Sequence, residues 1–139
     1  MAGYITQLRS KSSDSEKITI NLGYVDLGLI DLLVGEKFYS NRTDFIRTAI
    51  RNQLERQSEA TKQFASRKSL ELGLRLLTRR ELEDVRARGE MLYLRVLGLA
   101  TIADDVSAEL AIATIGSIEV LGALHASPAV KAALGDRLA

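Results

Sequence analysis

The chain has 139 residues, of which 46% are hydrophobic and 27% charged. This composition is typical of a soluble globular protein with one domain or two small ones. The chain has no cysteine and one histidine, which excludes disulfides, thiolate nucleophiles and, within one chain, a multi-histidine metal site. We therefore expect no enzyme activity, no catalytic residue, no cofactor and no metal. The sequence has no apolar run long enough to cross a membrane, so we expect a cytoplasmic protein without a membrane partner.

The N-terminal part combines a polar stretch with a short alternating segment. Residues 1–15 are polar and rich in serine, so we expect a flexible arm. Residues 17–22 alternate strictly between polar and apolar, which predicts a strand with one buried face. The polar positions are Lys17, Thr19 and Asn21, and the apolar ones are Ile18, Ile20 and Leu22.

Two helices are predicted after this strand. Apolar residues recur at helical spacing over residues 25–34, and residues 35–40 are expected to form a turn. Asn41, three residues before Asp44, is typical of an N-cap with an acidic partner. A second helix is therefore expected from that point to about residue 65, without a break. Its apolar stripe begins with Phe45, Ile46, Ala49 and Ile50.

A single strand of six residues has no partner nearby in the sequence, so its backbone would remain unpaired. Two copies of the chain solve this problem if their strands pair antiparallel about a two-fold axis. Such a homodimer would turn Lys17, Thr19 and Asn21 outward, and a two-stranded ribbon fits the DNA major groove. The expected dimer core consists of Ile18, Ile20, Leu22, Phe45, Ile46, Ala49 and Ile50.

The segments KITINL, residues 17–22, and FYSNRTDFIRTAIRNQL, residues 38–54, resemble the ribbon-helix-helix transcription factors of the Arc and CopG type over roughly residues 16–57. The resemblance implies an obligate dimer, double-stranded DNA as the partner, base contacts from the outward strand residues and a phosphate at the start of the second helix. The family often has glycine in the turn where Lys37 stands.

A phosphate site at that helix start also follows from charge and geometry. Free N–H groups of Arg42 and Thr43 at a helix N-terminus, together with the Arg42 side chain, form an anion site. Ser40 and Asn41 are expected to add polar contacts. Residues 1–68 contain 11 basic and 8 acidic residues, whereas residues 69–139 contain 8 and 10. The half that is expected to bind DNA is therefore the basic half.

The C-terminal half alternates strand-like and helix-like segments. Gly73, Gly98 and Gly122 each follow a leucine within a strand-like segment, at a spacing of about 25 residues that is compatible with a repeat architecture. Helices between strands favour parallel neighbours. Two interpretations remain open here: three degenerate strand-helix units, or an ordinary small α/β domain whose strands contain glycine.

The expected fold is α+β, with three parts: a flexible arm (1–15), a ribbon-helix-helix domain for DNA binding and dimerisation (16–68), and a small α/β domain of about three strand-helix units (69–139). The third part is expected to form higher homo-oligomers or to bind a partner or effector. The expected function is sequence-specific DNA binding by a transcriptional repressor. An antitoxin whose C-terminal part binds a toxin is the alternative, and a self-assembling structural protein is a third hypothesis.

Overall fold

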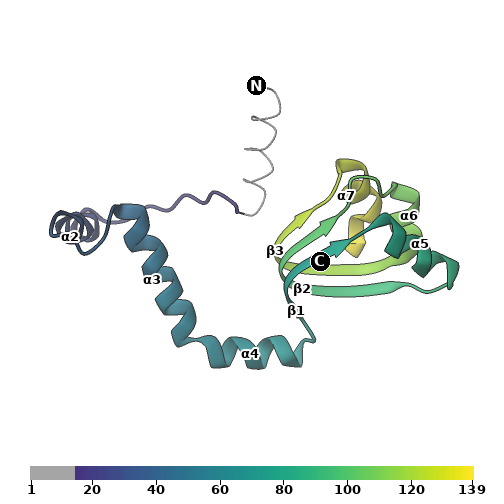
Figure 1. Ribbon diagram of the computed structural model, residues 1–139, viewed down its shortest axis with the longest axis horizontal. Coiled ribbons are helices and arrows are strands. Elements are labelled where there is room, and N and C mark those ends of the chain that lie inside the picture. The colour runs from purple at the N-terminus through teal and green to yellow at the C-terminus, as the bar shows by residue number, and fades with distance from the viewer. Residues whose placement is uncertain (1–14) are drawn as a thin grey trace, which may run out of the picture. The chain divides into compact units, whose positions relative to one another are not determined.

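The structure is a computed structural model that describes residues 15–139 (Figure 1). The expected arm therefore lies outside the described residues, apart from Ser15. Residues 15–23 form neither helix nor strand in the single chain. A strand is defined by its pairing, and a lone segment has nothing to pair with. The strand expected at residues 17–22 thus stays a prediction about a second copy of the chain.

The two helices expected after residue 24 begin where the sequence predicts them. Helix α2 spans Tyr24–Gly35 and helix α3 begins at Arg42. The Asn41 side chain caps α3 by accepting a hydrogen bond from the Asp44 N–H at 2.8 Å. The Asp44 carboxylate in turn accepts from the Ser40 N–H at 2.9 Å. The two side chains satisfy backbone donors that a helix start leaves without intrahelical acceptors.

The expectation of one unbroken helix to about residue 65 is wrong. Helix α3 spans Arg42–Arg56 and a separate helix α4 spans Ser58–Arg67. Gln57 leaves the helical conformation with φ −102° and ψ 11°, and its N–H donates to the Leu54 carbonyl three residues back, at 3.2 Å. This short-range bond closes α3 with a tight last turn. No glycine or proline marks the position in the sequence.

The chain divides into two compact units between Ala60 and Thr61. The second unit holds a three-stranded parallel sheet in the order β1-β2-β3. Its strands are β1 (Glu71–Leu77), β2 (Leu92–Ile102) and β3 (Ile115–His125). The helices α5 (Arg79–Ala87), α6 (Ala108–Thr114) and α7 (Pro128–Leu134) follow these strands in turn, and a short 3-10 helix, η2 (Gly135–Arg137), comes last. The predicted parallel α/β arrangement is confirmed.

Each helix of this unit begins with the same local chemistry. The hydroxyl groups of Thr78, Ser107 and Ser127 accept hydrogen bonds from the backbone N–H three residues later, at 3.1–3.2 Å. These N-caps satisfy backbone donors that the helix starts would otherwise leave without acceptors. Gly89, with φ +67°, lies just after α5, where glycine commonly ends a helix.

The core of this unit lies between one face of the sheet and α5–α7, which Figure 1 shows grouped together. The buried strand residues occupy alternate positions, as period 2 requires. They include Leu94, Val96, Ala100 and Ile102 of β2. The helices contribute Leu82, Val85, Leu110, Ala111, Val130 and Leu134. Among the described residues, no helix is long and apolar enough to cross a membrane.

The three strand glycines lie side by side across the sheet. Gly73 is in register with Gly98, and Gly98 with Gly122. All three have positive φ, at 108°, 138° and 124°. A Cβ built on Gly98 would lie 2.2 Å from the Gly73 carbonyl oxygen, and one on Gly122 would lie 2.0 Å from the Gly98 oxygen. The sheet therefore requires glycine at the two inner positions, and this alignment supports the interpretation as three strand-helix units.

Candidate nucleic-acid interface

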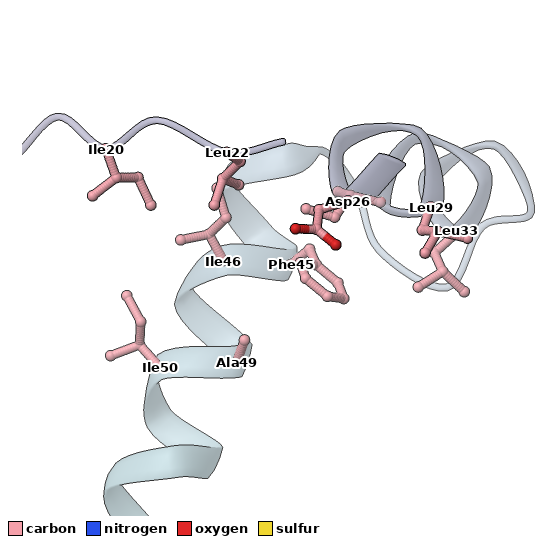
Figure 2. A pocket seen from close by; sticks show the side chains of 10 residues that line it. Ile20, Leu22, Asp26, Leu29, Leu33, Phe45, Ile46, Ala49 and Ile50 are labelled. Atoms are coloured by element: carbon pink, nitrogen blue, oxygen red, sulfur yellow. The ribbon is translucent and has the colours of Figure 1, made fainter. Parts of the chain in front are cut away.

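An apolar hollow lies in the first unit, between residues 20–22, α2 and α3 (Figure 2). Its volume is about 390 Å³. Figure 2 shows the side chains of Ile20 and Leu22 on the same side as Ile46 and Ile50 of α3. Six of the seven residues expected in a dimer core line this hollow, namely Ile20, Leu22, Phe45, Ile46, Ala49 and Ile50.

The apolar side chains around the hollow are largely uncovered in the single chain. Ile20 is 56% exposed, Ile50 47% and Leu22 37%. Ile18, the seventh expected core residue, does not line the hollow and is 72% exposed. Helix α3 has no buried residue, and α2 buries only Ile30. An amphipathic helix gains most of its stability by burying its apolar face, so this unit is incomplete without another apolar surface.

The three polar residues expected to read bases are all exposed. Lys17, Thr19 and Asn21 alternate with the apolar residues of the same extended segment. Two of the apolar residues that alternate with them, Ile20 and Leu22, face the hollow. Base contact by these three side chains stays a prediction.

The Arg42 side chain makes a contact that the sequence analysis missed. Its Nε donates to Asp31 Oδ1 and its Nη2 to Asp31 Oδ2, each at 2.8 Å. This bidentate ion pair joins α2 to the first residue of α3, and both side chains are about half exposed. The hydrogen bonds and the charge of Arg42 lower the pKa of the Asp31 carboxyl, and the same contacts raise the pKa of Arg42. The pair thus links the two helices across the turn between them.

The start of α3 leaves two backbone donors open. The N–H groups of Asp44 and Phe45 are bonded to Asn41. Within residues 15–139, the N–H groups of Arg42 and Thr43 have no hydrogen-bond acceptor. Such groups at a helix N-terminus attract anions. Lys37 and Ser40 line a second hollow of about 340 Å³ beside this point, together with Asp44. The expected phosphate residues Ser40, Asn41, Arg42 and Thr43 are all exposed.

Lys37 has the backbone conformation of a glycine. Its φ of 71° lies in the left-handed region that L-residues rarely adopt. This agrees with the glycine that the resembling family often has in this turn. The lysine side chain is exposed, and it lines the second hollow together with Ser40 and Asp44.

Sequence reasoning missed two parts of this site. Asp31 lies eleven residues before Arg42, so no helical or strand spacing connects the two. The α2 side chains Leu29, Ile30 and Leu33, which line the hollow with those of α3, were left out of the expected core. The apolar stripe of α2 was a sufficient signal for them.

Comparisons with known proteins agree with this geometry. The family model described as the Ribbon-Helix-Helix transcriptional regulator family matches residues 13–131. The comparison with curated proteins and the comparison with solved structures found no match. The family match extends beyond the segment of residues 16–57 whose motifs indicated it, and it includes most of the parallel sheet unit. The chain belongs to the Ribbon-Helix-Helix transcriptional regulator family.

Proposed function

We propose that the chain is a sequence-specific DNA-binding repressor whose dimeric ribbon reads the major groove. The observation that carries this proposal is the uncovered apolar hollow between residues 20–22, α2 and α3. A second copy of the same segment supplies an apolar strand face for each hollow and pairs the two backbones antiparallel. The protein acts by binding and carries out no chemical step.

The outward side chains have the chemistry for base recognition. The ammonium group of Lys17 suits the O6 and N7 acceptors of guanine, and the amide of Asn21 suits the N6 and N7 edge of adenine. The Thr19 hydroxyl both donates and accepts, so it suits either kind of base. A dimer presents two copies of this set, which predicts a palindromic operator.

Phosphate binding positions the ribbon on the duplex. The open N–H groups of Arg42 and Thr43 point out of the start of α3, where the helix dipole favours an anion. The Asp31 pair uses Nε and Nη2 of Arg42, so Nη1 is left to approach a phosphate. Contacts to phosphate set register and orientation, and they carry no direct sequence information.

An affinity measurement with two matched asparagine variants tests this division of roles. Asn21→Ala should lose about 1–3 kcal/mol on the operator selected by the wild type, with little change on random DNA. Asn52→Ala, an exposed asparagine within α3, serves as the control and should change neither affinity. Arg42→Ala should weaken binding to both DNAs alike. Equal losses on both DNAs for Asn21→Ala would refute base reading by this residue.

Repression follows if the bound dimer occupies an operator that polymerase needs. The parallel sheet unit has its own buried core, so it is a folded domain. This observation disfavours the antitoxin alternative, because toxin-binding tails of such regulators are usually short and disordered when alone. The sheet unit serves assembly or partner binding in this proposal.

A further inference from the structure

The sequence of residues 70–76, which includes all of β1 but its last residue, is symmetric about Gly73. Residues 70–76 read Leu-Glu-Leu-Gly-Leu-Arg-Leu. Gly73 is the centre, leucines mirror leucines, and Glu71 mirrors Arg75. A segment with this symmetry is complementary to an antiparallel copy of itself, because each acidic residue then meets a basic one.

This strand is also the open edge of the sheet. In the order β1-β2-β3, β1 pairs only with β2. The opposite edge is partly covered, because Leu138 forms a bridge with Ile118 of β3 and the Ala139 N–H donates to the Ile118 carbonyl at 3.0 Å. Within residues 15–139, no segment pairs in this way with the outer side of β1. An uncovered edge strand is a template for pairing with another chain.

The leucines of β1 are unusually exposed. Leu72 is 66% exposed, Leu74 82% and Leu76 53%, and all three project from the sheet face opposite to α5–α7. A further strand beside β1 would bury part of these side chains, as the strands on both sides of β2 do for its leucines on the same face. Leu97 and Leu99 are in register with Leu72 and Leu74, and each is only partly exposed.

The central glycine leaves room for a close neighbour. A Cβ on Gly98 or Gly122 would meet the carbonyl oxygen of the adjacent strand, whereas a Cβ on Gly73 would meet nothing within 4 Å. The row of glycines across β3, β2 and β1 therefore ends at Gly73, which has no neighbouring strand on its outer side. A further strand can approach the backbone there without meeting a side chain at position 73.

We propose that two copies of this chain pair their β1 strands antiparallel, centred on Gly73, to form a continuous six-stranded sheet. In this register Glu71 lies opposite the partner's Arg75, and Leu72 lies opposite the partner's Leu74. A register centred on Leu74 would instead place Glu71 opposite the partner's Leu77, which is buried and apolar. Opposite charges stabilise a cross-strand pair, whereas a charge facing an apolar residue does not.

The charged residues are already placed for this contact. Arg75 donates to Glu81 of α5 from Nη2 at 2.6 Å and from Nη1 at 3.3 Å, and Nη1 also donates to the Leu76 carbonyl at 3.2 Å. Its Nε lies 3.5 Å from the Glu71 carboxylate. These contacts hold the guanidinium over the core side of β1, on the same face as Glu71. A guanidinium has five N–H donors, so it can bind a further carboxylate from a neighbouring strand.

Hydrogen exchange of the full chain, followed by mass spectrometry on peptides from residues 70–77, tests the pairing. At a total chain concentration about tenfold above the dissociation constant of the pair, about one fifth of the chains remain unpaired, so the edge amides should exchange about fivefold slower than at high dilution. Glu71→Arg should weaken pairing by about fivefold or more, because it opposes like charges at both symmetric positions. The triple variant Glu71→Arg/Arg75→Glu/Glu81→Arg, which keeps an opposite charge beside position 75, should recover protection.

A matched control carries the same charge change away from the edge. Glu83 of α5 is paired with Arg79 at 3.5 Å and is about as exposed as Glu71, at 58% against 54%. Glu83→Arg should leave the protection of β1 unchanged. Protection that does not depend on concentration, or that Glu71→Arg leaves intact, overturns the proposal. If Leu121→Asp, on β3, reduced protection of β1 as much as Glu71→Arg does, the contact would be packing between sheet faces. That result would also overturn the proposal.

Disulfide trapping tests the register directly, because the chain has no cysteine of its own. When Glu71→Cys protein is mixed with Arg75→Cys protein and oxidised, a crosslinked pair should form at least about fivefold faster than in either variant alone, because only the mixture places two cysteines directly opposite. Equal yields in all three samples would contradict the register. This contact involves neither DNA nor residues 17–22, so its failure and the failure of the proposed DNA reading are separate results.

Discussion

Replacing Gly98 with alanine should destabilise the sheet unit far more than the same change at Gly73. Both glycines have positive φ, at 138° and 108°, and an alanine in such a conformation costs about 1–3 kcal/mol. Only Gly98→Ala adds a collision, because its Cβ would lie 2.2 Å from the Gly73 carbonyl oxygen, whereas ordinary contacts begin at 3.4 Å. Strands β1 and β2 would have to separate by about 1 Å, which weakens their hydrogen bonds.

The expected losses are about 3–5 kcal/mol for Gly98→Ala and about 1–2 kcal/mol for Gly73→Ala. A difference of about 2 kcal/mol corresponds to a shift of about 1 M in the urea midpoint. Far-UV circular dichroism of the full chain in urea measures both midpoints. The measurement is repeated at several protein concentrations, because a loss that is linked to assembly changes with concentration and an intrachain collision does not. Equal losses for the two variants would refute the argument from the carbonyl contact.

Three further predictions concern local features. Lys37→Gly should raise the free energy of unfolding by about 1 kcal/mol in urea unfolding, because φ of 71° is strained for lysine. Thr78→Ala should lower the thermal stability of the sheet unit by about 1 kcal/mol, because it removes the cap on the Glu81 N–H. Arg42 lowers the pKa of the Asp31 carboxyl below its ordinary value of 3.8. The stabilisation from this pair is therefore present above pH 3.8 and is lost as the pH falls through the lower pKa of the folded state. Carboxyl NMR titration should give the lowered pKa in the wild type and the ordinary value in Arg42→Ala.

Local patterns in the sequence were sufficient to predict most elements of the fold. The apolar spacing of residues 25–34 predicted α2, the Asn41 cap predicted the start of α3, and the spacing of Gly73, Gly98 and Gly122 indicated the repeat that the register supports. These features depend on residues within about four positions of each other, or on a regular spacing. Both can be recognised in a single sequence.

Contacts between distant residues were not predictable in this way. The break at Gln57 comes from a residue type that is common inside helices. The pairing of Asp31 with Arg42 depends on how the turn at residues 36–41 folds back. The strand at residues 17–22 illustrates the opposite case: the pattern predicts it, and no segment within residues 15–139 pairs with it.

The most direct test of the proposed DNA reading is selection of bound duplexes from a random pool by the full chain, with the triple variant Lys17→Ala/Thr19→Ala/Asn21→Ala selected in parallel. The wild type should enrich one palindromic sequence, and the triple variant should enrich none while it keeps weak, salt-dependent binding through phosphate contacts. If the wild type enriches no sequence, or if the triple variant enriches the same one, these three side chains do not read DNA.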